Sequence, residues 1–424
     1  MKVGIFHVGT QHSWQTAQAF QESGELGWYA TSIFYKPTEW PYRVENLAPA
    51  GWRAKLHREF ARRYTPALDA EKVHLVGPWE WGRTIARRLH FAWADHQLNL
   101  LNIQQASRRV IRLMQESPVD VLWSFNTMAL EVFAHARKAG VRCVLDQTIG
   151  HPAAMNELFT REHEQGRDYF RSPYQPFSAD WIARQDREIE LADEIVVGSE
   201  FCADTLLDNG CPAHKITVLP YGYDETRFAG AQPRAVPPPG QPLRFLFVGA
   251  LEPRKGAHYL LEAFKRIPPS VATLTVVGRQ AVPVARIAEA PGHIAFVPQV
   301  PRSEVPGYFQ AADCFIFPSL FEGSALVLYE ALGAGLGIIQ TKSAGFGVVD
   351  GKNGVLLQQP SVEMLVDAVM HLSRNPALVA AWSQESRCLG ATHRWSDYRE
   401  QCRRFVHGSV AAGSVGLLHG EAGP

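Results

Sequence analysis

Short runs of apolar residues alternate with amphipathic stretches along most of the chain. Residues 3–8 (VGIFHV), 119–125 (VDVLWSF) and 272–278 (ATLTVVG) are runs of this kind, and residues 98–115 form one of the amphipathic stretches. Runs that are apolar throughout and are separated by helices are typical of buried parallel strands in βαβ units. The alternation therefore predicts an α/β fold, in which helices cover both faces of parallel sheets.

A stretch without hydrophobic periodicity interrupts this rhythm near the middle of the chain. Residues 231–242 (AQPRAVPPPGQP) contain five prolines and are typical of an interdomain linker. We predict two doubly wound, Rossmann-like domains, at residues 1–230 and 243–390, that face a central cleft where the carboxyl ends of the strands bind ligands. A helix at 391–407 is expected to cross back onto the first domain. The Gly/Ala-rich tail at 408–424 is expected to be disordered.

The chain is electrically balanced and poor in cysteine. Its 424 residues include 42 Lys or Arg and 42 Asp or Glu, which argues against a protein that binds nucleic acid through bulk positive charge. The six cysteines are scattered without a Cys-x-x-Cys pair, so reduced thiols in a cytosolic protein are the simpler interpretation. No window approaches the roughly 20 uncharged apolar residues of a membrane span. We expect a cytoplasmic protein that is attached, at most, to the inner face of a membrane.

Segment 42–90 departs from this balance. It contains ten Lys or Arg against five acidic residues, and four tryptophans lie in or beside it: Trp40, Trp52, Trp79 and Trp81. A basic, tryptophan-rich surface suits an anionic membrane leaflet or an anionic acceptor. An ordinary solvated helical insertion with half-buried tryptophans has the same composition. Both interpretations stay open.

Residues 317–339 (FPSLFEGSALVLYEALGAGLGII) contain the clearest candidate site. Glu322 and Glu330 are eight residues apart, and Glu330 lies in an otherwise apolar helix, where a buried carboxylate needs a partner. We expect that helix to begin at about Ser324. Gly323 and Ser324 would then offer free backbone N–H groups and the positive end of the helix dipole to a diphosphate. An N-terminal Glu followed by a structurally paired Glu would give the same spacing.

The second half of the chain resembles the family 4 retaining glycosyltransferases of the GT-B fold. The Glu-x7-Glu motif of that family falls on Glu322 and Glu330. The resemblance covers residues 187–360, and the strand pattern in residues 1–150 is compatible with it. The other matching segments, in order, are 187–228, 247–264 (FVGALEPRKGAHYLLEAF), 276–278, 297–299, 311–339 and 350–357 (DGKNGVLL).

The resemblance implies a sugar transferred from a nucleotide-diphosphate-sugar to an acceptor with retention of anomeric configuration. The first domain would bind a saccharide or lipid-linked acceptor of bacterial polysaccharide or glycolipid biosynthesis, and the second the nucleotide-sugar. Lys255, aided by Arg254, would stabilise the departing phosphate. Glu322 would hold hydroxyls of the donor sugar, and Glu330 would accept hydrogen bonds from the ribose hydroxyls.

Further donor contacts are implied by the same resemblance. Gly249, Gly323, Ser324 and Ala325 would contact the donor from the second domain, while Gly9 and Thr10 would close over the diphosphate from the first, where a side chain at position 9 would crowd it. No metal and no cofactor is implied, because cations do the work of a metal and no two aspartates stand two residues apart.

The chain departs from the family pattern at three places. Ala250 replaces the arginine that usually follows the glycine of FVG, and Gly337 replaces a proline. The family often has a histidine after the strand at 141–146, where this chain has Asp146 and Gln147, with His151 the nearest histidine. Asp146 and His151 are therefore candidates to contact the sugar. A GT-B phosphorylase, an epimerase and a non-catalytic nucleotide-sugar-binding protein remain alternatives.

Overall fold

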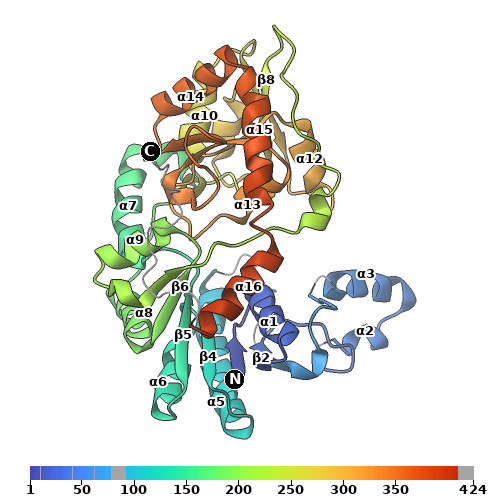
Figure 1. The fold of residues 1–424 in the computed structure, drawn as a ribbon, viewed down its shortest axis with the longest axis vertical. Helices are drawn as coiled ribbons and strands as arrows, with labels where there is room; N and C mark the ends of the chain where they lie inside the picture. The colour runs from blue at the N-terminus through green and yellow to red at the C-terminus, as the bar shows by residue number, and fades with distance from the viewer. Residues whose placement is uncertain (10, 41, 62, 78–91, 409–424) are drawn as a thin grey trace. The chain divides into compact units, whose positions relative to one another are not determined.

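The computed structural model describes residues 1–9, 11–40, 42–61, 63–77 and 92–408, and Figure 1 shows its course. The chain forms two compact units that interleave along the sequence. The first unit comprises residues 1–146, 183–196 and the chain from Arg399. The second comprises 147–182 and 197–398. The domain limits expected at residues 230 and 243 stay a prediction.

The first sheet has seven strands in the order β3-β2-β1-β4-β5-β6-β7, and the strands from β3 to β5 pair in parallel. Every residue of β1 and β4 is buried, as expected for strands with helices on both faces. The strands are β1 (Val3–Phe6), β2 (Leu26–Thr31), β3 (Val73–Leu75), β4 (Val121–Phe125), β5 (Arg142–Gln147), β6 (Glu194–Val197) and β7 (Ile216–Val218). The helices in this part of the chain are α1 (Ser13–Glu22), α5 (Ala92–Glu116), α6 (Leu130–Lys138), α7 (Pro152–Gln165), α8 (Ala179–Leu191) and α9 (Glu200–Asp208).

Between β2 and β3 the chain forms what we call the α2–α3 lobe, residues 35–61. It contains α2 (Val44–Leu47) and α3 (Ala50–Ala61), which stand out to the side of the first unit's sheet in Figure 1. The lobe has a small core of its own, formed by Tyr35, Tyr42 and Phe60. Leu56 of the lobe and Leu75 of β3 pack against this core, so the lobe is an insertion that is anchored to the edge of the sheet.

The second sheet has six strands in the order β10-β9-β8-β11-β12-β13, all of them parallel. This confirms the predicted α/β class with parallel sheets. The strands are β8 (Leu243–Val248), β9 (Ala272–Val277), β10 (Ile294–Val297), β11 (Cys314–Phe317), β12 (Gly337–Thr341) and β13 (Gly354–Leu357). The helices are α10 (Ala257–Arg266), α11 (Val284–Ala288), α12 (Val305–Ala311), α13 (Leu326–Gly333), α14 (Val362–Arg374) and α15 (Ala377–Gly390).

The proline-rich segment 231–242 has no helix or strand, yet it is anchored to the second unit. The Arg234 guanidinium donates to the carbonyl oxygens of Ala312 (2.8 Å) and Phe309 (2.7 Å), and its backbone N–H donates to Ser383 (2.8 Å). Three such bonds fix the path of the segment in spite of its prolines.

The last helix, α16 (Trp395–Val406), packs on the first unit along its C-terminal part. Arg403 pairs with Glu22 of α1 at 2.8 Å, and the rings of Phe405 and Trp123 meet edge to face. Beyond Gly408 the predicted tail lies outside the described residues, as do Thr10, Trp79 and Trp81. Among the described helices, none combines the length and apolar character needed to cross a bilayer.

Candidate active site

The sequence PRKG turns the chain sharply just beyond β8. Pro253–Lys255 form a short 3₁₀ helix, η5, which ends at Gly256 with φ 72°. A Cβ at Gly256 would overlap the carbonyl oxygen of Pro318, so only glycine fits this turn. The turn places the Arg254 and Lys255 side chains beside the loop that follows β11.

Arg254 and Lys255 converge on one carboxylate, that of Glu322. Arg254 Nη1 lies 2.9 Å from Glu322 Oε1, and Lys255 Nζ donates to the same oxygen. Ser319 Oγ also donates to it, at 2.8 Å. Adjacent residues in an extended segment would point to opposite sides. The 3₁₀ turn of η5 explains why two neighbours reach one oxygen.

The cluster is largely withdrawn from water. Burial lowers the pKa of Lys255, although the charge of Glu322 opposes this. Burial alone would raise the pKa of Glu322, but Lys255 and Arg254 outweigh it and hold that pKa below its usual value. Lys255 Nζ also lies 5.0 Å from the centre of the Phe317 ring, which suits a cation–π contact. Two cations share the carboxylate of Glu322, which cannot neutralise both of them, so the cluster can still attract an anion.

Arg254 is more fully engaged than Lys255. Its guanidinium donates to the Phe321 carbonyl oxygen at 3.0 Å and pairs with Glu252 at 3.2 Å, besides contacting Glu322. Arg254 therefore ties η5 to the loop after β11. Lys255 is the cation of the pair that has fewer bonds to give up to a ligand.

Glu330 has a partner that the sequence did not reveal. Its Oε1 lies 2.8 Å from Arg227 Nη1 of η4 (Glu225–Phe228), and burial raises the pKa of Glu330 while Arg227 opposes the shift. The side chain is 21% exposed, so a ligand can still reach the carboxylate. Arg227 lies in the matched segment 187–228, but nothing in that stretch singled it out from its neighbours.

The loop before α13 differs from the expectation in one respect. The helix begins at Leu326, with Ala325 as its N-cap, two residues later than predicted. The N–H of Ala325 donates to the Ala344 carbonyl oxygen at 3.0 Å, so it is not available to a diphosphate. Within the described residues, the amides of Gly323 and Ser324 make no such bond. These two are the loop donors that a ligand could use.

The backbone explains why two of the predicted site residues are glycines. Gly249 has φ 152°, a conformation that side chains rarely adopt, and it directly follows β8. A Cβ at Gly323 would overlap the carbonyl oxygen of Thr148. Glycine is therefore required at both places for backbone reasons, whatever the ligand.

The remaining predicted residues lie elsewhere or outside the description. Gly9 belongs to the first unit and its N–H donates to His7 Nδ1 at 2.8 Å, while Thr10 lies outside the described residues. His151 is the N-cap of α7, where its Nδ1 accepts from the Ala153 N–H at 3.3 Å. That bond gives His151 a structural role. The donor contacts of Gly9 and Thr10 stay a prediction.

Asp146 forms a buried pair that sequence reasoning missed. It accepts hydrogen bonds from His12 Nε2 at 2.9 Å and from Trp123 Nε1 at 3.1 Å, all within the first unit. Nearby, burial lowers the pKa of His7 to about 4. The two histidines in HVGTQH, directly after β1, were the available signal. The first unit thus places a histidine at the end of its sheet, although not at the position where the family often has one.

Two family models cover most of the chain. The glycosyl transferase 4-like domain matches residues 42–222, and glycosyl transferases group 1 matches residues 230–388. The GDP-mannose-dependent alpha-(1-6)-phosphatidylinositol monomannoside mannosyltransferase of Mycolicibacterium smegmatis is 25% identical over 66% of this chain and 74% of its own length. The putative colanic acid biosynthesis glycosyltransferase WcaL of Salmonella typhimurium is 29% identical, and the glycogen synthase of Mycobacterium tuberculosis 28%. The chain spans about half the length of these last two proteins (46% and 50%).

Solved glycosyltransferase structures share the fold. The Anabaena HepE structure in complex with UDP-glucose gives a TM-score of 0.61, with 96% of this chain and 100% of HepE covered. Sucrose-phosphate synthase of Thermosynechococcus elongatus gives 0.64, with 96% and 98% covered. Both are 14% identical to this chain, so the similarity supports the GT-B fold and no more specific assignment. The chain belongs to the glycosyl transferases group 1 family and is a glycosyltransferase of the GT-B fold.

Proposed function

We propose that the protein transfers a sugar from a nucleotide-diphosphate-sugar, with retention of anomeric configuration, to a saccharide or lipid-linked acceptor of bacterial polysaccharide or glycolipid biosynthesis. The observation that carries the proposal is the convergence of Lys255 and Arg254 on Glu322, beside the free amides of Gly323 and Ser324. The names of the relatives, which include a glycolipid mannosyltransferase and a colanic acid glycosyltransferase, support the class of acceptor.

The chemistry requires stabilisation of a departing diphosphate. As the bond between the anomeric carbon and the phosphate oxygen breaks, negative charge grows on the phosphate. Lys255 and the two loop amides are placed to receive it. The acceptor oxygen bonds to the anomeric carbon on the same face, and its proton passes to the departing phosphate oxygen. No protein base is then needed.

The two glutamates hold the donor on either side of the diphosphate. Glu322, fixed by Ser319 and the two cations, accepts hydrogen bonds from hydroxyls of the sugar. Glu330, held by Arg227, accepts them from the ribose hydroxyls. A carboxylate held by a cation is a strong, oriented acceptor, which is what binding of a diol requires.

Product analysis separates this proposal from its rivals. A thermal-shift screen against a panel of nucleotide-sugars first identifies the donor, because ligand binding raises the unfolding temperature. With that donor, a transferase forms a glycosylated acceptor, an epimerase changes the donor without an acceptor, and a phosphorylase needs inorganic phosphate. A binding protein would release no nucleotide even at high protein concentration.

We predict that activity does not depend on a metal ion. Lys255 and Arg254 can supply the positive charge that a metal ion would otherwise bring to the diphosphate, and the sequence has no Asp-x-Asp pair. Turnover after dialysis against EDTA is expected to stay within about twofold of the untreated rate. A complete loss that Mn²⁺ or Mg²⁺ restores would contradict the prediction.

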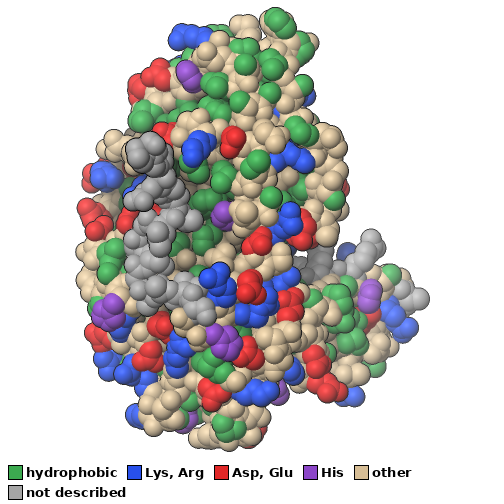
Figure 2. Space-filling model, viewed as in Figure 1, with side chains coloured by type: hydrophobic (Ala, Val, Ile, Leu, Met, Phe, Trp, Pro, Cys, Tyr) green, Lys and Arg blue, Asp and Glu red, His purple; other side chains and the backbone are tan. Residues whose placement is uncertain are grey.

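We further propose that the α2–α3 lobe contacts an anionic membrane. Trp40 and Trp52 are each 65% exposed and Leu47 is 76% exposed, values unusual for large apolar side chains. Arg43 and Lys55 are exposed nearby, and Lys55 lies over the Trp52 ring. Figure 2 shows hydrophobic and basic side chains together on this lobe. Exposed tryptophans among cations suit the interface of an anionic leaflet.

Vesicle co-sedimentation tests this contact. Binding to phosphatidylglycerol vesicles is expected to exceed binding to phosphatidylcholine vesicles. It should weaken in 1 M salt, where the Debye screening length falls to about 3 Å. Changing Arg43, Arg53 and Lys55 together to serine should weaken it about 100-fold, at roughly fivefold for each cation. Val284→Ser, at an exposed apolar side chain of the second unit, serves as the control. Equal binding to both kinds of vesicle, or binding to neither, would contradict the membrane contact and favour an ordinary solvated insertion.

A further inference from the structure

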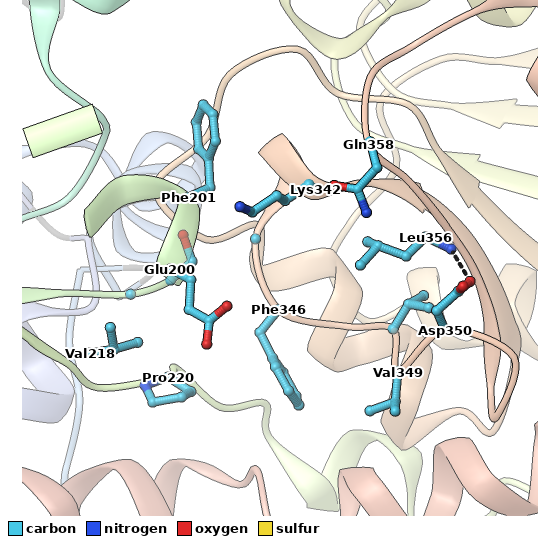
Figure 3. Close-up of a pocket in the computed structure, with 14 residues that line it drawn as sticks. Glu200, Phe201, Val218, Pro220, Lys342, Phe346, Val349, Asp350, Leu356 and Gln358 are labelled. Carbon is cyan, nitrogen blue, oxygen red and sulfur yellow. Dashed lines mark hydrogen bonds between the residues drawn. The ribbon is translucent and has the colours of Figure 1, made fainter. Parts of the chain in front are cut away.

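A cavity in the second unit has no role in the proposed donor site. Its volume is about 310 Å³, within the range of small-molecule sites. Its lining comes from segments that follow β6, β7, β12 and β13, the strand ends where ligands bind in parallel sheets. Figure 3 shows its labelled side chains. Lys255, Glu322 and Glu330 do not line it.

One wall of the cavity is rigidly built. Gln340, which is fully buried, donates to the Gly345 carbonyl oxygen at 2.6 Å. Asn353, also fully buried, donates to the Gly347 carbonyl oxygen at 2.9 Å and accepts from the Val349 N–H at 2.8 Å. Two buried amide side chains thus fix the loop over residues 345–349. A wall fixed in advance is what a binding site needs.

The cavity shares this framework with the donor loop. Ser199, on its opposite wall, donates from Oγ to the Gly323 carbonyl oxygen. Gly345, at φ 98°, packs so closely on Ser324 that a Cβ there would lie 2.8 Å from the Ser324 Cα. A ligand in the cavity would therefore lie directly beside the two residues whose amides are proposed to hold the donor.

The charges of the lining argue against a second phosphate site. Figure 3 shows the Glu200 carboxylate directed toward the space between Pro220 and Phe346, and within the described residues it has no ion pair or hydrogen bond. Lys342, the cation of the lining, is neutralised by Asp204 at 2.8 Å. A bound anion would be repelled by the unpaired carboxylate of Glu200. A lipid chain would dehydrate that carboxylate without offering it a hydrogen bond.

The lining suits an uncharged, hydroxylated ring instead. Val218, Pro220, Phe346 and Val349 present apolar surface, on which the C–H face of a pyranose can pack. Glu200 can accept hydrogen bonds from the hydroxyls at the edge of such a ring. We infer that the cavity binds a neutral sugar ring of the acceptor, with Glu200 as its hydrogen-bond acceptor. The inference rests on the proposed function, since it assigns the second substrate of the same reaction.

Saturation-transfer NMR with methyl glucoside and methyl mannoside tests the inference on the intact chain. The wild type is expected to bind at least one of them. Glu200→Ala should weaken that binding about tenfold, the size of one charge-assisted hydrogen bond. Val349→Trp, which fills the cavity, should weaken glycoside binding by at least the same factor. Glu385→Ala, at an exposed carboxylate on α15, is the matched control and should change nothing.

Donor binding and acceptor-independent nucleotide release are measured on the same variants and should stay within about twofold. Glycoside affinity unchanged in both cavity variants would overturn the inference. A wild-type protein that binds no neutral glycoside would also overturn the inference. Binding of glucosamine alone would overturn it as well, because its amine would indicate a cation site. Equal losses of donor and glycoside binding would assign the cavity to the donor. Failure of the wild type to bind any nucleotide-sugar would contradict the proposed function, while the glycoside titration would still be readable.

Discussion

Replacing Lys255 by alanine is expected to lower turnover by about 100-fold or more, which is the size of effect seen when one preorganised donor to a developing oxyanion is removed. The reason is electrostatic. Lys255 is largely buried, its pKa is lowered by burial, and it is paired with Glu322. A phosphate can take this lysine because Glu322 keeps Arg254 and Ser319 as partners. The measurement is steady-state nucleotide release at saturating donor, with circular dichroism to confirm folding.

Three variants make this result specific. Lys255→Arg should recover part of the loss, because the charge returns in a different shape. Lys265→Ala, a lysine of α10 paired with Glu262, should leave turnover unchanged. Arg254→Ala should cost less than Lys255→Ala and act mainly on donor KM, since Arg254 fixes the loop through the Phe321 carbonyl. A Lys255→Ala enzyme with normal turnover would overturn the assignment of the whole site.

Glu330→Gln is expected to weaken donor binding by about 1.5–3 kcal/mol, roughly 10- to 150-fold in Kd, because a hydrogen bond to a charged acceptor becomes a neutral one. Calorimetric titration with the donor measures this change. Glu225→Gln, an acidic neighbour of Arg227 on η4, is the control and should bind the donor normally. Unchanged affinity in Glu330→Gln would leave the Arg227 pair as a purely structural contact.

The same residue predicts a pH dependence. Burial raises the pKa of Glu330 above its ordinary value, so acidification protonates this carboxylate earlier than an exposed one. Because the charged form binds ribose better, the donor affinity of the wild type should fall as the pH drops toward that raised pKa. The Glu330→Gln variant should not show this fall in donor affinity at low pH. The same loss of donor affinity on acidification in both proteins would mean that another group causes it.

Much of the second unit could be predicted because its signals are local. The apolar runs became parallel strands, and the PRKG sequence holds two cations and a turn glycine within four residues. Glu322 could be expected near them because the carboxyl ends of neighbouring parallel strands meet at one edge of a sheet. The resemblance named Lys255 and Glu322 as site residues, but their contact, which joins two loops 67 residues apart in sequence, was not predicted.

The contacts that were missed join residues far apart in sequence. Arg227 and Glu330 are 103 residues apart, and His12 and Asp146 are 134 apart. A hydrophobic pattern indicates which side chains are buried and says nothing of which polar groups then pair. The late start of α13 has a similar cause, because the Ala325 amide is taken by Ala344, which lies on a different loop.

The anomeric configuration of the product is the most direct test of retaining transfer from a nucleotide-sugar. Proton NMR can follow wild-type protein incubated with the donor found by thermal shift and with its acceptor. We predict a new glycosidic anomeric signal with the same configuration as the donor, and its rate should fall about 100-fold in Lys255→Ala. A product of inverted configuration would contradict retaining transfer, as would donor consumption without any glycosidic product.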